Sequence, residues 1–336
     1  LPMNRIQTLG KLNRLQGWQA LSALRAFERH ANNLRAYDRV LFSGVYAPTA
    51  VAAREAGGNF YYCHTPPRFA YDLADWYRQT AHPWQRPALA WLAARVRDRF
   101  GTAMQRMDRI AANSATVRKR LEDHVGLTQV EVIHPPVATR EWNWLGQEAF
   151  FLSTARLEPY KRVDLIIEAF KATPELKLVV ASGGSQEAEL RQSATGHDNI
   201  TFTGWCSDQE LKRLTGNCRA TLYLARDEDF GMSPVESMAA GKPVIAAAEG
   251  GLLETVLHEQ TGLLLDPQHI SQPDTLIAAL GSMTQQRALG MRHACERRAA
   301  RFDSAVFDHA LRQFLGNQAL TPPDSFPPND RQGPGG

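Results

Sequence analysis

The sequence has few cysteines and no long apolar run. Its four cysteines include no CxxC pair, so neither a zinc site nor a disulfide framework is indicated. No apolar stretch approaches the ~20 residues that a membrane-spanning helix needs, and no signal peptide precedes the first predicted helix. We therefore expect a soluble, cytoplasmic protein. No nucleic-acid-binding motif is present either, and we expect no nucleic-acid partner.

Length and composition are those of a globular protein with two domains. The chain has 336 residues, of which 43% are hydrophobic and 22% charged, and it is long for a single core. The net charge of +3 hides an asymmetry, because residues 1–148 carry +8 and the rest −5. A basic first half suits an anionic membrane or substrate, although solvated helix faces are the commoner explanation.

Strand and helix signals alternate along both halves, which predicts parallel sheets with helices on their faces. The predicted strands are 39–43, 59–63, 109–113 and 130–133, then 150–153, 177–181, 200–203, 220–224, 243–247 and 262–265. The predicted helices are 48–55, 84–107, 114–124, 160–172, 207–215 and most of 273–315. Residues 1–37 are helical in pattern, with no strand and no glycine-rich turn.

Composition shifts suggest where the domains divide. We place a first Rossmann-like domain at 1–138, a linker containing tryptophan at 139–149 and a second Rossmann-like domain at 150–316. Residues 317–336 are rich in proline and glycine, and we expect them to form a disordered tail.

Residues 228–241 (EDFGMSPVESMAAG) combine several features of a ligand site. They follow a strand, and open α/β sheets bind ligands beyond the carboxyl ends of their strands. Ser233 is expected to cap a helix whose free amide groups favour phosphate. Glu228 in the loop and Glu236 inside the helix suit hydroxyl groups of an extended ligand such as a sugar and a ribose. Alternatively, Glu236 only completes a capping box and Glu228 is solvated.

Two cations follow the strand at 150–153. Arg156 lies in the loop, and Lys161 lies in the first turn of the predicted helix, where a cation opposes the helix dipole. Together they suit a diphosphate whose charge is stabilised without a metal. In the first half, His64 and Arg68 follow the strand at 59–63 and are available to a ligand, although a lone histidine at such a turn is more often structural.

These segments resemble glycosyltransferase family 4, which comprises retaining enzymes with two domains that use nucleotide sugars. The resembling stretches are EDFGMSPVESMAAGKPVIA, TARLEPYKRVDLIIEAF and the PPV at 135–137. YYCHTPPRFAYD resembles the CHTP-x-R segment of a subgroup that builds bacterial surface polysaccharides, many of them mannosyltransferases. The resemblance covers most of residues 37–316.

The resemblance implies a fold, an activity and partners. The fold is α/β, with two Rossmann-like domains facing a cleft (GT-B type). The activity is metal-independent transfer of a hexose, with mannose favoured, and without any cofactor. GDP-mannose is the favoured donor, and the acceptor is a saccharide or an undecaprenyl-diphosphate-linked sugar. Independently of the resemblance, the basic first half leads us to expect peripheral contact with the anionic inner face of the plasma membrane.

The resemblance further implies residue roles. Glu228 contacts the donor sugar, Glu236 holds the ribose, and the turn at Trp205 holds the base. Asp227 and Asp229 look like the DxD metal motif of another fold, but the following FG-x4-E context argues against a metal. The implied catalytic residues are His64, Glu228, Arg156 and Lys161; the implied donor-binding residues are Glu236, Gly231, Met232, Ser233, Gly183, Trp205 and Glu254; Arg68 lies on the acceptor or cleft side.

One feature of the family is missing. Family members open with a strand, a glycine-rich loop and a helix, none of which is visible here, so the chain is either N-terminally truncated or divergent, and we favour truncation. Two alternative functions remain open. One is a nucleotide-sugar 2-epimerase, which shares the architecture, and the other is a donor-binding but inactive partner subunit.

Overall fold

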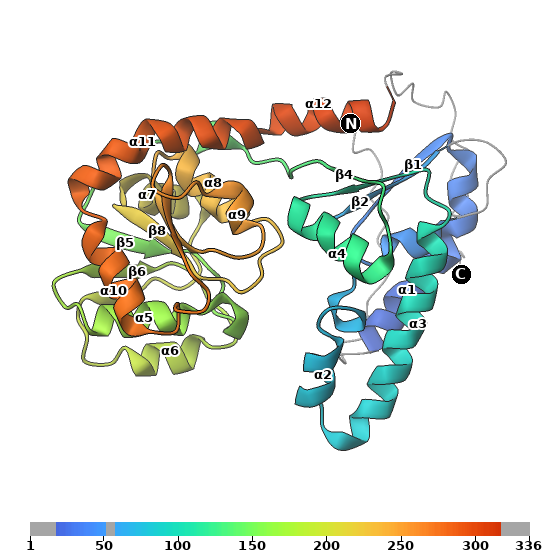
Figure 1. The fold of residues 1–336 in the computed structure, drawn as a ribbon, viewed down its shortest axis with the longest axis horizontal. Coiled ribbons are helices and arrows are strands. Elements are labelled where there is room, and N and C mark those ends of the chain that lie inside the picture. The colour runs from blue at the N-terminus through green and yellow to red at the C-terminus, as the bar shows by residue number, and fades with distance from the viewer. Residues whose placement is uncertain (1–17, 52–57, 317–336) are drawn as a thin grey trace, which may run out of the picture.

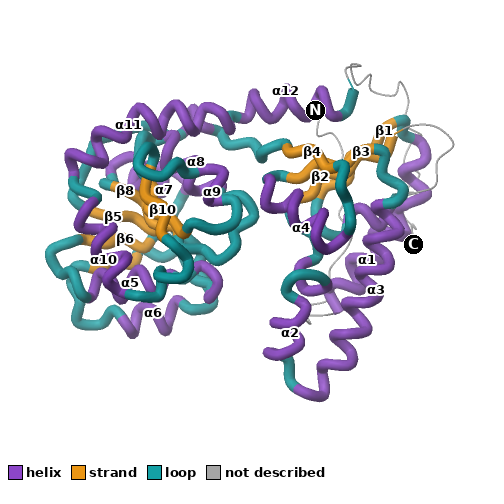
Figure 2. The backbone as a smooth tube through the Cα atoms, viewed as in Figure 1, coloured by secondary structure: helices purple, strands orange, loops and turns teal. Residues whose placement is uncertain are grey.

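The protein folds into two α/β units, each built on its own parallel sheet (Figure 2). The computed structural model describes residues 18–51 and 58–316. The first sheet has the order β1-β2-β3-β4 and the second the order β10-β9-β8-β5-β6-β7. The predicted fold class of two parallel-sheet domains is thus confirmed. The strands are β1 Arg39–Ser43, β2 Gly58–Cys63, β3 Arg109–Ala112, β4 Val130–Val132, β5 Phe150–Ser153, β6 Lys177–Val180, β7 Ile200–Phe202, β8 Ala220–Tyr223, β9 Val244–Ala247 and β10 Gly262–Leu265.

Helices pack around both sheets (Figure 1). In the first unit they are α1 Trp18–His30, α2 Ala74–Thr80, α3 Arg86–Met104 and α4 Ala115–Val125. In the second unit and beyond it they are α5 Val163–Lys171, α6 Glu187–Ser193, α7 Asp208–Asn217, α8 Met232–Ala239, α9 Leu252–Thr255, α10 Pro273–Ser282, α11 Gln285–Ala299 and α12 Ser304–Phe314. Because helices cover both faces of the second sheet, apolar strand residues such as Phe151, Leu152 and Leu222 expose none of their surface.

The strand order of the second sheet creates a switch point between β5 and β8. From β5 the chain runs outward through β6 to β7, and it then returns to β8 and runs the other way through β9 to β10. The loops that follow β5 and β8 therefore leave toward opposite faces of the sheet. Open α/β sheets bind their ligands at this point, beyond the carboxyl ends of the strands.

The helix α12 crosses from the second unit back onto the first sheet (Figure 1). Phe314 of α12 packs edge-on against Phe60 of β2, with ring centroids 5.6 Å apart. Arg39 of β1 donates a hydrogen bond of 2.7 Å to the backbone carbonyl of Leu315. Helix α12 thereby ties the two units together.

Several predicted helix boundaries differ from the structure. The helix predicted at 84–107 spans Arg86–Met104, and the preceding helix α2 is not predicted because it buries no residue and so has no apolar periodicity. In place of the helix predicted at 48–55, a 3-10 turn covers Ala47–Ala50, and residues 52–55 lie outside the described residues. Residues 1–17 and the predicted tail at 317–336 also lie outside them.

The helix predicted from Tyr160 begins three residues later, at Val163. Pro159 starts a 3-10 turn that ends at Lys161, and Arg162 then adopts a left-handed conformation with φ 53°. The placement of Lys161 in the first turn of the helix is therefore wrong. Its ammonium group belongs to a turn ahead of α5, so the unfavourable effect of the helix dipole that was expected for this cation does not apply.

Candidate active site

The loops at the switch point bring a predicted cation to a predicted carboxylate. Lys161 comes from the loop after β5 and Glu228 from the loop after β8, and their Nζ and Oε2 atoms lie 2.5 Å apart. Both side chains are largely buried, with exposed fractions of 15% and 24%. A charged pair in this position offers one donor and one acceptor to a ligand at the mouth of the sheet.

Arg156 lies in the same loop as Lys161 but on its outer side. Its guanidinium donates a hydrogen bond of 2.9 Å to the hydroxyl group of Tyr160 at the surface. The structure thus places both predicted diphosphate-binding cations in one loop after β5, with Arg156 free to reach an incoming anion by a change of side-chain rotamer.

Helix α8 begins one turn beyond Glu228, and its cap differs from the expected one. The helix starts at Met232 with Gly231 as its N-cap, so the prediction that Ser233 caps it is wrong. Gly231 has φ 90°, and a Cβ atom there would lie 2.9 Å from the side chain of Leu252, so the position requires glycine. No side-chain oxygen caps α8. Its first amide groups therefore remain available to an anionic ligand.

Glu236 lies inside α8, and burial raises its pKa above the ordinary value, with a hydrogen bond from Ser233 opposing that shift. Because Ser233 is not the cap, the capping-box explanation for Glu236 is also wrong. Lys212, whose charge acts on Glu236, is itself paired with Glu141 at 2.5 Å. Glu236 is thus a partly buried carboxylate that accepts a hydrogen bond from the hydroxyl group of Ser233.

Gly183 and Trp205 lie against each other at the carboxyl ends of β6 and β7. A Cβ atom on Gly183 would lie 2.4 Å from the indole Nε1 of Trp205, so a side chain there would displace the ring from this position. The indole is 72% exposed. An exposed aromatic face of this kind can stack on a planar ligand group such as a nucleobase.

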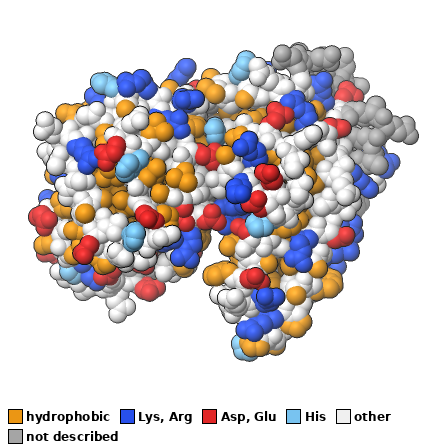
Figure 3. Space-filling view, in the orientation of Figure 1, with side chains coloured by type: hydrophobic (Ala, Val, Ile, Leu, Met, Phe, Trp, Pro, Cys, Tyr) orange, Lys and Arg blue, Asp and Glu red, His pale blue; other side chains and the backbone are white. Residues whose placement is uncertain are grey.

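The loop that carries Glu228 is held in place from the first unit. Asp227 adopts a left-handed conformation with φ 53°, and Arg68 contacts its carboxylate at 2.6 Å. Arg120 of α4 donates to the carbonyl of Asp227 at 2.7 Å and forms an ion pair with Asp229. The two residues that flank Glu228 are therefore fixed by arginines from the other half of the molecule (Figure 3, where blue and red side chains meet between the lobes).

The contacts with Arg68 and Arg120 also affect the pKa values of Asp227 and Asp229. Burial opposes the charge of Asp227, but Arg120 and Arg68 outweigh it and hold its pKa below the ordinary value. For Asp229 the burial dominates over the same two arginines, and its pKa is raised. The pair that looks like a DxD metal motif is thus neutralised by guanidinium groups. Among the described residues, no group of three or more candidate ligands could hold a metal ion.

Sequence reasoning missed Arg120, although a signal for it was present. Val117, Arg120 and Leu121 share the buried face of α4, and the Arg120 side chain is only 7% exposed. An arginine in register with apolar residues on a helix needs a charged partner when that face is buried. The spacing therefore marked Arg120 as a paired residue, but the partner lies more than a hundred positions away.

His64 lies on the first unit beside this contact. Its Nε2 atom is 2.8 Å from the hydroxyl oxygen of Ser43, and its ring packs edge-on against Tyr62. Burial lowers the pKa of His64, while the charge of Asp229 opposes that shift. His64 and Glu228 thus approach the same region from opposite units.

Glu254 has partners in the first unit. Its carboxylate accepts hydrogen bonds from the backbone amides of Ala115 and Thr116, at 2.7 and 2.9 Å, and lies 3.3 Å from His134. Burial opposes its charge, but these hydrogen bonds outweigh the burial and lower its pKa. Glu254 therefore caps helix α4 across the joint between the units, and its role beside a donor stays a prediction.

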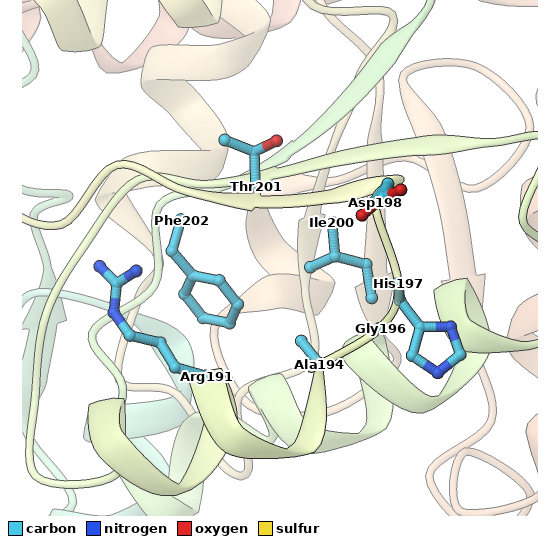
Figure 4. A pocket seen from close by; sticks show the side chains of 8 residues that line it. All are labelled: Arg191, Ala194, Gly196, His197, Asp198, Ile200, Thr201 and Phe202. Atoms are coloured by element: carbon cyan, nitrogen blue, oxygen red, sulfur yellow. The ribbon is translucent and has the colours of Figure 1, made fainter.

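A separate surface hollow lies against the edge strand β7, and its lining residues include none of the predicted site residues. Arg191 stacks over Phe202 there, beside His197 and Asp198 (Figure 4).

Comparison with known proteins agrees with this architecture. A family model described as "Glycosyl transferases group 1" matches residues 138–302, and one described as "Glycosyltransferase Family 4" matches residues 4–141. In fold, the protein is similar to sucrose-phosphate synthase from Thermosynechococcus elongatus, with a TM-score of 0.71 and 19% identity over 93% of this chain and 82% of the other.

Two curated relatives are named as mannosyltransferases. The alpha-1,3/1,6-mannosyltransferase ALG2 of Dictyostelium discoideum is 34% identical over 37% of this chain and 35% of its own length. The O-antigen chain mannosyltransferase C of Escherichia coli is 24% identical over 61% of this chain and 56% of its own length. The chain thus spans about a third to a little over half of these relatives.

The two facing parallel-sheet units define the GT-B class of glycosyltransferase folds. Within that class, the chain belongs to glycosyltransferase family 4, the group 1 glycosyltransferases.

Proposed function

We propose that the protein is a retaining glycosyltransferase that moves a hexose, with mannose favoured, from a nucleotide-diphosphate sugar to a saccharide or lipid-linked acceptor in the synthesis of a cell-surface polysaccharide. The observation that carries the proposal is the Lys161–Glu228 pair beside the uncapped start of α8, at the switch point of the second sheet. Cation, carboxylate and helix amides converge where a diphosphate and its sugar would lie.

Each part of a nucleotide sugar has a matching group in this site. The diphosphate meets Lys161, Arg156 and the first amides of α8, which stabilise the negative charge that develops as the sugar departs. Glu228 accepts hydrogen bonds from sugar hydroxyl groups, and Glu236 does the same for the ribose. A phosphate that binds Lys161 competes with Glu228 for the ammonium group, so donor binding also frees that carboxylate for the sugar.

Transfer is proposed to proceed without a metal ion. Two cations and the helix dipole supply the positive charge that a divalent metal supplies in other enzymes. The engagement of Asp227 and Asp229 by Arg68 and Arg120 supports this, because these carboxylates are already matched by positive charge. A chelator should therefore leave transfer unchanged.

The acceptor is proposed to bind on the side of the first unit. His64 lies there with a lowered pKa, so at neutral pH its ring is uncharged and can exchange hydrogen bonds with sugar hydroxyl groups. An undecaprenyl-diphosphate-linked acceptor would lie at the cytoplasmic face of an anionic membrane, and the basic first half suits that location. Among the described residues, no helix has the length and apolar character to cross a bilayer.

A thermal-shift screen against GDP, UDP, ADP and their mannose and glucose conjugates tests the donor site. A ligand at a hundred times its dissociation constant stabilises the folded protein by about 2.7 kcal/mol, which is a readily measured shift. The expected result is stabilisation by one nucleoside diphosphate and its sugar, lost in a Glu228→Gln, Lys161→Ala double variant. Failure of every nucleotide to stabilise the protein would refute the proposal.

A second assay separates transfer from the alternatives. Radiolabelled donor incubated with and without acceptor distinguishes transfer, which needs the acceptor, from 2-epimerisation, which changes the donor alone. Binding of donor without either reaction would point to a partner subunit.

A further inference from the structure

Helices α2 and α3 form an arm that extends from the first unit away from its sheet (Figure 1). The arm carries three exposed tryptophans: Trp76 is 55% exposed, Trp84 72% and Trp91 59%. Tyr77 adds a fourth exposed aromatic ring, at 40%. Large aromatic side chains on a surface are unfavourable in water unless they serve an interaction, and here they are concentrated within sixteen residues.

The exposed rings of α3 are not part of the core of the first unit. Leu92 and Val96 face inward and pack with Leu24 of α1. Trp91 lies on α3 and is exposed, whereas Trp84 lies in the 3-10 turn Pro83–Gln85 that precedes the helix. The ring of Trp84 contacts that of His82, with centroids 6.1 Å apart, and both rings are still largely open to solvent. The inner face of α3 therefore holds the fold together, while the exposed tryptophans lie outside the core.

The charges of the arm are strongly one-sided. Residues 74–104 contain five arginines and two aspartates, with no lysine and no glutamate, giving a net charge of +3. Arg95 is exposed, and Arg78 is 61% exposed but pairs with Asp75 at 2.8 Å, so Arg95 is the more available cation. Figure 3 shows basic and hydrophobic side chains next to each other at the lower end of the arm.

We propose that this arm, with Trp84 and Trp91 at its centre, docks the protein onto the surface of an anionic phospholipid bilayer. Tryptophan and tyrosine prefer the membrane interface, where the ring lies among the acyl chains and the polar edge meets the headgroups. Arginines beside them bind lipid phosphates through bidentate contacts and are attracted by the surface charge. The small residues between the tryptophans, Ala88 and Ala90, allow the helix backbone to approach the headgroups closely.

A protein partner fits these observations less well. The centre of a protein interface is usually depleted of charge, whereas here arginines alternate with the rings along the whole arm. Membrane docking by the arm would bring the site close to the lipid-linked acceptor of the proposed function. The docking proposal rests on that function only for its biological purpose. Docking of the arm itself requires neither donor nor transfer.

Co-sedimentation of the full chain with sucrose-loaded vesicles tests the arm directly. The parent protein should bind vesicles of phosphatidylcholine with 30% phosphatidylglycerol, and bind them more weakly in high salt and on pure phosphatidylcholine. A Trp84→Ala, Trp91→Ala variant should lose at least about tenfold in partition coefficient. Arg95→Ala should lose about fivefold at low salt, and Arg78→Ala should lose less because Asp75 already pairs with Arg78.

The matched control is Trp205→Ala, since that indole is as exposed as Trp84 but lies in the second unit. It should leave vesicle binding unchanged and weaken donor binding, while the arm variants should do the opposite. Failure of the arm and failure of the donor site are thereby separate results. All these side chains are exposed, so melting temperatures should not change.

Two results would overturn the proposal. One is equal vesicle binding by the parent and the Trp84→Ala, Trp91→Ala variant. The other is a concentration-dependent dimer, seen by analytical ultracentrifugation without lipid, that the same double variant abolishes, because the arm would then bind a second copy of the chain.

Discussion

Replacement of Arg120 tests whether the two units cooperate in holding Glu228. The change to examine is Arg120→Met, which keeps most of the volume of a side chain that is only 7% exposed and removes its charge. It deletes the contacts to the Asp227 carbonyl and to both aspartates. Because these contacts join different units, their loss acts on the closure of the units rather than on the folding of either one.

The magnitude follows from the burial of Arg120, which is 7% exposed, and from the partial exposure of its partners Asp227 and Asp229, which are 44% and 32% exposed. Removing one member of a buried ion pair costs about 3–5 kcal/mol, because the other charge remains unpaired. The ion pair between Arg68 and Asp227, at 2.6 Å, remains in the variant, and Asp229 has a raised pKa and can take up a proton. The lower end of that range therefore applies. A loss of about 3 kcal/mol corresponds to roughly a hundredfold in the closed population or in kcat/KM.

The assay combines X-ray scattering for the separation of the units with donor affinity and transfer rate. We expect a larger radius of gyration, a kcat/KM about a hundredfold lower and a smaller change in donor affinity. Arg120→Lys should recover part of the loss, since it restores charge without the planar fork. Arg118, exposed on the same helix, provides the control Arg118→Ala. If Arg120→Met behaves like that control, the reasoning is refuted.

Four further variants test individual side chains. Glu236→Gln should lower donor affinity about ten- to a hundredfold, which corresponds to a loss of ~1.5–3 kcal/mol of binding free energy. Stability should not change, because no capping box is present. Calorimetry that shows parent-like affinity would remove Glu236 from the site. Arg156→Ala and Lys161→Ala should each weaken nucleotide diphosphate binding by a similar amount while the nucleoside alone binds as before, and equal losses for both ligands would contradict a diphosphate contact. The pKa of His64 in the folded protein is depressed below 6.5, so its contribution to stability is present above the unfolded pKa and is lost as the pH falls through the folded pKa. Between pH about 7.5 and about 5.5, the free energy of unfolding measured by denaturation should therefore fall less in His64→Asn than in the parent.

The sequence predicted the elements of the second unit well, because each one has a clear local signal. Strands such as β5 and β10 are short apolar runs, and their predicted bounds match the structure. Ser207, predicted as the start of a capped helix, accepts a hydrogen bond from the amide of Glu210 as expected of an N-cap. In these places the backbone conformation is decided within a few residues, so no tertiary information is needed.

The prediction failed where distant backbone decided the conformation. Ser233 has the right chemistry for a cap, but Gly231 takes that position because Leu252 packs against it. Similarly, Gly250 and Gly251 lie so close to the backbone of the Glu228 loop that a Cβ atom on either would clash with it. The sequence pattern of one segment identifies such residues, but it does not predict their contact with a loop about twenty residues away in the sequence.

The structure also changes how the opposite charges of the two halves are interpreted. In the sequence, the excess of +8 over residues 1–148 suggests an anionic partner, but part of that charge is used inside the molecule. Arg68 and Arg120 meet Asp227 and Asp229 of the acidic half. These cations are matched at the joint and cannot also attract a membrane. The arginines of the α2–α3 arm lie outside this joint, so they and the tryptophans beside them, rather than net charge, locate the surface at which a bilayer would bind.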